Sequence, residues 1–295
     1  MQPSTVDFVT AAGLDPAYVD LLVTVALAED LAGGVDVTSE ATIPAGDEAT
    51  AELVARAPGV LAGLPLAAAA FDLVGAGTVH FAPSTKDGER VARGDVLATV
   101  TGPTRALLTA ERTALNLLCH ASGVATATRA WVDALAGTQA MVRDTRKTTP
   151  GLRLLEKYAV RCGGGVNHRM SLADQALVKD NHVLAAGGVV EAFRAIRSRY
   201  PGLAVEVECT TVAQVREVVA AGAELVLLDN MGTREMAEAV RAARGIDPGV
   251  RLEASGTLRL DRAREVAATG VDYLSVGALT HSAPVLDIAM DLRGR

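Results

Sequence analysis

The sequence predicts an α/β protein in which an N-terminal, sandwich-like α+β domain is followed by an incomplete, open parallel α/β barrel. Six short apolar runs in the second half each end in a polar or small residue and precede a helix-like segment. Their spacing of roughly 20 to 35 residues is the length of a βα unit. The first half mixes helical and strand patterns with turn residues instead. Because six units fall short of the eight of a closed barrel, an open barrel is predicted, with a closed one as the alternative.

In the first half, one helix and three strands are expected, followed by a long linking helix. Their ranges are 17–31 for the helix, 50–57, 77–83 and 95–103 for the strands, and 111–135 for the linking helix. We predict domain limits of 1–118 for the α+β domain and 119–281 for the barrel. The C-terminal residues 282–295 are expected to pack back on the first domain.

The six apolar runs of the second half are expected to be the barrel strands. They are 139–144, 175–180, 203–208, 223–229, 250–255 and 272–277. In a parallel barrel the reactive groups gather at the C-terminal ends of the strands. The residues that end these runs should therefore meet at one mouth: Asp144, Lys179, Glu208, Asp229, Ser255 and Gly277.

Composition limits the function classes. With 295 residues, 49% of them hydrophobic, the chain can bury a large core. A formal net charge of −7 argues against broad binding of nucleic acid or of an anionic membrane, since both need an extended basic surface. Any bound anion should be small.

The cysteines and the N-terminus indicate a soluble, cytoplasmic protein. Cys119, Cys162 and Cys209 are odd in number and show no CxxC pairing, so neither a disulfide framework nor a structural zinc site is expected. Residues 1–20 lack the basic and apolar regions of a signal peptide, and no run reaches the roughly 20 apolar residues of a membrane span.

A cluster of basic residues stands out in this acidic chain. Between Arg143 and Lys179 there are eight Lys or Arg residues and three acids. Four charged residues with helical spacing are predicted to form a solvated helix face: Arg153, Glu156, Lys157 and Arg161. Four others follow strands or glycine-rich turns and are predicted to converge: Arg146, Lys147, Arg169 and Lys179.

Converging cations require a partner. Two like charges about 4 Å apart repel by roughly 4 kcal/mol at an effective dielectric constant near 20. A ligand with several anionic groups would offset this cost, since Arg offers a planar fork and Lys a movable point charge. His168, next to Arg169, fits either donation to such an anion or a structural role.

Two later runs end in acids, and the last two end in small residues. Glu208 and Asp229 fit charge balance, Mg²⁺ coordination or binding of sugar hydroxyls, with helix capping as the alternative. The turns "EASGTL" and "SVGALTHSAP" offer free N–H groups where α/β barrels commonly bind phosphate. A phosphoribosyl donor with an acidic acceptor fits all of these features.

At this point several stretches resemble the quinolinate phosphoribosyltransferase family almost letter for letter. In the second half they are "DTRKTTPGLRLLEKYAVRCGGGVNHR", "KDNH", "VEVECTT", "LLDNM" and "EASG". In the first half "AEDLAGGVDVTSEATIP", "GVLAGLP" and "ERTALNLLCHASGVAT" also resemble the family, so the likeness covers most of the chain.

The resemblance implies a reaction of quinolinate with phosphoribosyl pyrophosphate and Mg²⁺ that yields nicotinate mononucleotide, pyrophosphate and CO₂. It implies Lys147, Glu208 and Asp229 as catalytic residues, with the last two as Mg²⁺ ligands, directly or through water. It also implies a homodimer in which Arg112 comes from the neighbouring subunit. The implied substrate-binding residues are Arg112, Thr145, Arg146, Lys147, His168, Arg169, Lys179, Glu208, Asp229, Ser255, Gly256, Thr257, Val276, Gly277, Ala278 and His281.

The chain departs from the family pattern in two places. Met170 and Ser171 stand where glycine is expected shortly after "NHR", and Thr257 stands where many members have a second glycine. A side chain at Thr257 narrows the phosphate turn or adds a hydroxyl donor.

Three alternatives remain, and the likeness to the other phosphoribosyltransferase fold is accidental. One is a relative of the same fold with another acceptor, such as the molybdenum-transport-associated homologue. A second is a Schiff-base aldolase using Lys147 or Lys179. The other phosphoribosyltransferase fold usually has two adjacent acids, whereas "LLDNMGT" has one, followed by Asn230. A non-catalytic protein would bind both ligands and convert neither.

Overall fold

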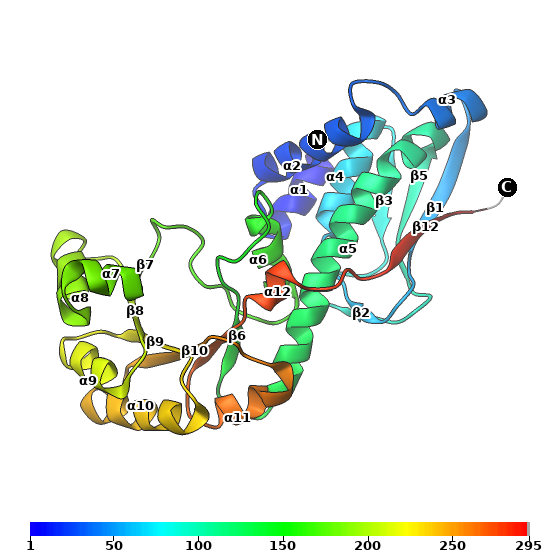
Figure 1. Ribbon diagram of the computed structural model, residues 1–295. Coiled ribbons are helices and arrows are strands. Elements are labelled where there is room, and N and C mark those ends of the chain that lie inside the picture. The colour runs from blue at the N-terminus through cyan, green and yellow to red at the C-terminus, as the bar shows by residue number, and fades with distance from the viewer. Residues whose placement is uncertain (294–295) are drawn as a thin grey trace. The chain divides into compact units, whose positions relative to one another are not determined.

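The computed structural model describes residues 1–293, which form two compact units (Figure 1). The first comprises Met1–Ala127, Pro150–Gly164 and the segment from Ala283 onward. The second comprises Thr128–Thr149 and Gly165–Ser282. These contact-based limits assign Pro150–Gly164 to the first unit, a grouping that the sequence pattern did not indicate.

The first unit is built on an antiparallel sheet with the strand order β12-β1-β5-β3. Its strands are β1 (Glu48–Ala55), β3 (His80–Pro83), β5 (Val96–Pro103) and β12 (Ile288–Leu292). β2 (Gly59–Val60) and β4 (Arg90–Val91) form a separate antiparallel pair. The three strands predicted here are confirmed, and β12 brings the C-terminal segment back to β1, with Leu53 opposite Met290.

The helices of the first unit supply much of its core. They are α1 (Pro3–Ala11), α2 (Pro16–Leu31), α3 (Val37–Thr42), α4 (Leu64–Gly75), α6 (Arg153–Cys162) and most of α5 (Thr104–Ala134). Asp15 caps α2 by accepting from the Ala17 N–H, with Pro16 at the first helical position. α4 is buried along most of its length. α5 begins directly after Pro103, earlier than the predicted start at residue 111.

The prediction of a solvated face on α6 is wrong. Glu156 and Lys157 are fully buried, and Glu156 lies 3.0 Å from Nε2 of His120. The i,i+4 charge pattern suggested an exposed helix, but α6 belongs to the compact first unit and is buried on most of its surface. The spacing of charges along a helix does not show which other segments pack against it, so it could not predict this burial.

The second unit is a six-stranded parallel sheet with the order β6-β11-β10-β9-β8-β7. Its strands are β6 (Met141–Arg143), β7 (Ala176–Val178), β8 (Val205–Cys209), β9 (Leu225–Asp229), β10 (Arg251–Ser255) and β11 (Tyr273–Ser275). Five lie within a predicted run and β8 extends one residue beyond its run, so all six predicted strands are confirmed. Within residues 1–293, β6 and β7 are the edge strands, and the barrel is therefore open.

Helices connect the strands of this sheet. They are α7 (Asp180–Ala186), α8 (Val189–Arg199), α9 (Val212–Ala220), α10 (Thr233–Ile246), the short 3₁₀ turn η1 (Leu260–Arg262), α11 (Ala263–Ala267) and α12 (Ala278–His281). Figure 1 shows α9 and α10 next to each other along one side of the sheet. Among the described residues no single helix is long and apolar enough to span a membrane, whereas α1 and α2 pass that test as a pair bent by 112°.

Candidate active site

A cavity of about 620 Å³ lies at the C-terminal ends of the barrel strands, and we call it the main cavity. Twelve of the predicted site residues line it: Thr145, Arg146, Lys147, His168, Arg169, Lys179, Glu208, Asp229, Ser255, Gly256, Thr257 and Gly277. All of them belong to the second unit. Strand ends that are far apart in the sequence thus supply one site, as the barrel pattern predicted.

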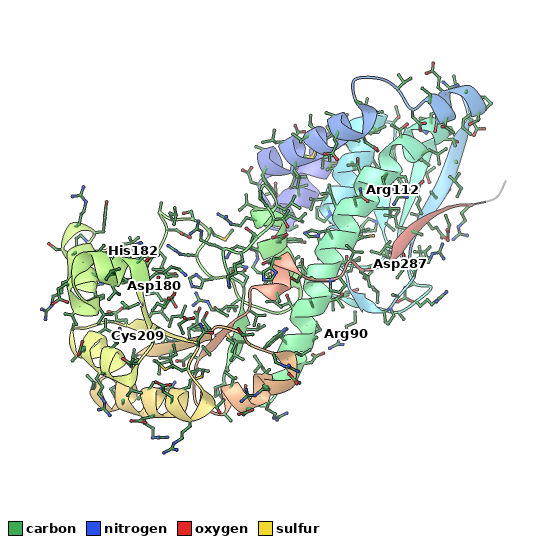
Figure 2. All side chains as sticks on the ribbon, in the orientation of Figure 1. Arg90, Arg112, Asp180, His182, Cys209 and Asp287 are labelled. Atoms are coloured by element: carbon green, nitrogen blue, oxygen red, sulfur yellow. The ribbon has the colours of Figure 1, made fainter. Side chains whose placement is uncertain are left out.

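Four predicted residues do not line this cavity. His281 is exposed but lies close to Gly277, because a Cβ added there would be 3.2 Å from its Nε2. Val276 is buried and donates its N–H to the Arg143 carbonyl at 2.9 Å. Ala278 is exposed at the start of α12. Arg112 lies on α5 in the first unit with 64% of its side chain exposed, and lines a smaller cavity beside α2 residues (Figure 2).

Four basic residues line the main cavity, and we call Arg146, Lys147, Arg169 and Lys179 the basic wall. Nε of Arg146 is buried and has no hydrogen-bond partner within residues 1–293. Burial lowers the pKa of Arg169, and the nearby charge of Arg146 lowers it further. The repulsion expected between converging cations is therefore present, together with an unused donor. Both favour an anionic ligand.

Two contacts fix the position of Lys147 in the basic wall. Thr280 donates its hydroxyl to the Lys147 carbonyl at 2.7 Å, which ties the loop after β6 to α12. The side chain of Lys147 passes over Gly277, where a Cβ would be 2.9 Å from its Cδ. Gly277 has a φ of −66°, so this close approach, and not backbone conformation, is what requires glycine there.

Glu208 and Asp229 form the acid pair of the main cavity. Burial raises the pKa of Glu208, and the charge of Asp229 raises it further, while Lys179 at 3.4 Å opposes the shift. A largely buried carboxylate with a second carboxylate beside it suits a hard divalent cation such as Mg²⁺. The donor set therefore fits the predicted metal site.

Sequence reasoning missed two polar residues beside the acid pair. Asp180, labelled in Figure 2, lines the cavity at the start of α7. Asn230 also lines it and donates its side-chain amide to Asp229 at 2.8 Å. Asn230 has a φ of +53°, a conformation that Asn tolerates better than most residues. The signal in the sequence was the "DN" pair at a strand end.

The glycine turn after β10 is packed against Asn230. Gly256 has a φ of +118°, and a Cβ there would be 2.3 Å from Oδ1 of Asn230. Thr257, the residue that departs from the family pattern, is exposed and lines both the main cavity and a neighbouring one of about 220 Å³. Its hydroxyl is therefore accessible at the turn where phosphate is expected.

A second layer of side chains lies one step below the mouth, because residues two apart on a strand face the same side. Its members are Arg143, Leu177, Glu206, Leu227, Glu253 and Ser275, each two residues before a cavity residue. Glu206 and Glu253 are fully buried, and we call them the buried acids. Glu253 accepts from Arg143 at 2.5 Å and from the hydroxyl of Ser275.

Burial raises the pKa of both buried acids, and that of Glu253 to about 7. The neighbouring carboxylate of Glu206 adds to the shift at Glu253, while the charge of Arg143 opposes it. The guanidinium of Arg143 also lies 4.5 Å from the ring centroid of Tyr273. The side chain of Arg143 thus contacts Glu253 and Tyr273 inside the barrel and is not among those that line the main cavity.

Asp144 is the one run-ending residue that does not line the main cavity, so this part of the prediction is wrong. It is fully buried and accepts from the backbone N–H of His168 at 2.8 Å and from the amide of Asn167 at 2.5 Å. Its carboxylate is therefore used to hold the loop that carries His168 and Arg169. From sequence alone, an acidic residue directly after a strand could either line the mouth of the barrel or bind a neighbouring loop.

An open parallel barrel with a basic wall, an acid pair and a glycine turn around one cavity is an arrangement typical of enzymes that join anionic substrates. Models of the two quinolinate phosphoribosyl transferase domains match the chain, the N-terminal one at residues 36–122 and the C-terminal one at 124–291. The chain belongs to the quinolinate phosphoribosyl transferase family and is a phosphoribosyltransferase.

Individual relatives agree with this assignment. The chain is 53% identical over 268 residues to the nicotinate-nucleotide pyrophosphorylase [carboxylating] of Mycobacterium leprae, covering 90% of this chain and 94% of the relative. It is 40% identical over 282 residues to the human protein of that name, covering 95% and 93%. The solved nicotinate-nucleotide pyrophosphorylase of Francisella tularensis superposes with a TM-score of 0.90 at 35% identity, covering 95% and 98%.

Proposed function

We propose that this protein transfers the phosphoribosyl group of phosphoribosyl pyrophosphate to quinolinate. Nicotinate mononucleotide, pyrophosphate and CO₂ are the products, and the reaction belongs to the de novo synthesis of NAD. The observation that carries the proposal is the main cavity, where a basic wall with an unused Arg146 donor adjoins the acid pair and a glycine turn. The relatives named above support it by the activity in their names.

The bond changes explain why no covalent nucleophile is needed. The ring nitrogen of quinolinate bonds to C1 of the ribose as the bond from C1 to pyrophosphate breaks. The nitrogen then carries a positive charge, which stabilises the electron pair left on the neighbouring carbon when its carboxylate departs as CO₂. That carbon finally takes up a proton. The protein therefore needs to position the two substrates and to balance charge.

The basic wall would bind the two carboxylates of quinolinate. Arg146 and Arg169 can offer paired N–H donors to a carboxylate, and Lys147 and Lys179 can follow the charge as it moves. Lys147 is the proposed catalytic cation, because it is exposed, lines the cavity and is held between Thr280 and Gly277. Loss of one carboxylate as CO₂ would leave the acceptor with one negative charge fewer, so the basic wall would bind the product less tightly than the substrate.

The acid pair would bind the donor. Glu208 and Asp229 are proposed to hold the ribose hydroxyls and Mg²⁺, directly or through water, and to contribute to catalysis. Bound Mg²⁺ would offset the charge that develops on the leaving pyrophosphate. The turns at Ser255, Gly256 and Thr257 and at Gly277 are the proposed phosphate sites, with Val276, Ala278 and His281 next to them.

A homodimer is also proposed, with Arg112 completing the partner's acceptor site. Arg112 is largely exposed and lines a small cavity together with α2 residues. Leu21 and Val25 of the same helix are 63% and 57% exposed, which favours an interface on this surface. A cytoplasmic location is proposed as well, since all three cysteines are unpaired in the described residues.

A turnover assay tests the proposal. The purified protein is incubated with quinolinate, phosphoribosyl pyrophosphate and Mg²⁺, and nicotinate mononucleotide is measured by chromatography. Product should require all three components and should disappear when a chelator removes Mg²⁺. Absence of product under conditions where phosphoribosyl pyrophosphate binds tightly would refute quinolinate as the acceptor and favour a relative with a different acceptor.

A further inference from the structure

His168 is held between the buried acids on the floor of the main cavity. Its Nε2 lies 2.8 Å from Oε2 of Glu206 and 3.6 Å from Oε1 of Glu253. The side chain is only 6% exposed, yet it lines the cavity. Two carboxyl groups therefore face one edge of the imidazole, from strands β8 and β10.

The opposite edge of the ring accepts a hydrogen bond. The backbone N–H of Arg169 donates to Nδ1 of His168 at 2.6 Å. A proton on Nδ1 would point at this N–H, so Nδ1 must be unprotonated and the ring proton must be on Nε2. The imidazole is then neutral, and its single N–H points at the buried acids and not into the cavity.

The surroundings of the buried acids fix this arrangement. Glu253 takes hydrogen bonds from Arg143 and Ser275, and Gln175 donates its amide to Glu206 at 3.2 Å. Arg169, whose charge also acts on Glu206, donates to the carbonyl of Gln175 at 3.0 Å. Oε1 of Glu206 has no partner among the described residues. Contacts from several segments thus lock the acids whose carboxyl groups hold the ring.

His168, Glu206 and Glu253 are also close enough together to ligate a metal ion. Three donors already occupy the positions such an ion would need: the Nε2 proton, Arg143 and Ser275. A guanidinium in direct contact with one carboxylate also disfavours a second cation there. The geometry therefore favours a protein network over a metal centre.

We propose that Glu206 and Glu253 are positioning residues of the acceptor site, which hold His168 as a neutral Nε2–H imidazole on the floor of the main cavity. The inference rests on the proposed function and deepens it. The acceptor's carboxylates are then bound by the cations of the basic wall, while His168 presents an uncharged ring against which the acceptor can pack. His168 on the cavity floor and the cations of the basic wall would together favour an aromatic acceptor whose anionic groups lie on one edge of the ring.

The first test is nitrogen-15 NMR of protein labelled at histidine, recorded without substrates. The chain has five histidines, and the signals of His168 are assigned by their loss in His168→Gln. The proposal predicts one protonated and one unprotonated ring nitrogen, with the proton on Nε2. An imidazolium, or a proton on Nδ1, would overturn it.

The second test separates positioning from general stability. Glu206→Leu removes the acceptor for the Nε2–H, and Glu206→Gln keeps a carbonyl oxygen in its place. We expect the leucine variant to raise KM for quinolinate about tenfold with KM for phosphoribosyl pyrophosphate unchanged, and the glutamine variant to restore most of the loss. Glu238→Leu, at an exposed position on α10, is the matched control. Equal changes in both KM values, or none in a folded leucine variant, would contradict the proposal.

Two further outcomes are distinguishable. If diamagnetic Zn²⁺ removes the Nε2 proton of His168 in the wild-type protein but not in Glu206→Gln, the cluster is a metal site and the positioning role is wrong. If the wild-type protein makes no nicotinate mononucleotide, the proposed function fails, while the NMR spectrum still decides whether the buried acids hold a neutral His168. The positioning claim therefore has a readout that needs no turnover.

Discussion

The side chain of Lys147 packs directly over the backbone of Gly277, so that a single methyl group at residue 277 would be 2.9 Å from Cδ of the lysine. This contact joins the loop after β6 to the turn after β11. It places the proposed catalytic cation next to a proposed phosphate turn. Substitution of Gly277 therefore tests the position of Lys147 without removing any charge.

Gly277→Ala should lower kcat/KM about tenfold, which corresponds to about 1.4 kcal/mol in the transition state. Its φ of −66° suits alanine, so the melting temperature should stay close to that of the wild type. Gly202→Ala is the control, because a Cβ at Gly202 meets no atom within 4 Å. Full activity of Gly277→Ala would show that Lys147 need not occupy this position.

Lys147→Ala and Glu208→Ala should each lose at least about 100-fold in kcat, the size expected when one preorganised charged group is removed. Both side chains line the main cavity, so each variant should stay folded, with an unchanged far-ultraviolet circular dichroism spectrum. Arg197→Ala, in the last turn of α8, serves as the surface control. Retained turnover in either variant would remove that residue from the proposed catalytic set.

Arg112→Ala should be inactive alone if the acceptor site is shared between subunits. Mixing it with inactive Lys147→Ala should restore part of the activity, because hybrid dimers would contain one site with both residues intact. Subunit exchange is verified separately with differently tagged chains. No recovery after verified exchange would contradict a shared site.

Asn230 allows backbone and side-chain effects to be separated. Asn230→Gly keeps the positive φ and loses the amide that binds Asp229, whereas Asn230→Ala loses the amide and strains the backbone. The alanine variant should therefore be less stable than the glycine variant by about 1 kcal/mol in urea unfolding. Both should bind Mn²⁺ and phosphoribosyl pyrophosphate more weakly by calorimetry. Unchanged binding in both would show that Asp229 does not depend on this amide.

The buried acids give the folded protein a specific pH dependence. Burial raises the pKa of Glu253 to about 7 in the folded state, above its ordinary value of 4.5. Between these two values the folded state binds more protons than the unfolded state, so this residue's contribution to stability falls as pH rises, by at most about 1.4 kcal/mol per pH unit. The unfolding free energy of the wild type minus that of Glu253→Gln should therefore decrease from pH 5 to pH 7, because only the wild type carries this titrating group. A value of this subtraction that increases over the range would contradict the raised pKa.

The strands and the basic wall were predictable because each depends on a local signal. A short apolar run such as 223–229 predicts a buried parallel strand, and the barrel geometry then places Asp229 at the mouth. The second layer carried a weaker signal. In "VEVEC", Glu206 and Glu208 alternate with valines, and only the barrel shows that the first is buried beneath the second.

Other features depend on contacts between distant segments, which no local pattern contains. The burial of Glu156 and Lys157 follows from the packing of α6 in the first unit. The role of Asp144 depends on a loop more than twenty residues further along the chain. The sequence left two roles open for His168, donation to an anion or a structural role. The hydrogen bond to its Nδ1 distinguishes them, and it forms only in the folded chain.

The measurement that tests the central claim most directly uses quinolinate labelled with carbon-13 in the 2-carboxylate, with nicotinate as a parallel acceptor. The account predicts one labelled CO₂ for each nicotinate mononucleotide formed from quinolinate, and little or no product from nicotinate, which offers the basic wall only one carboxylate. Efficient use of nicotinate, or product from quinolinate without stoichiometric release of labelled CO₂, would contradict it.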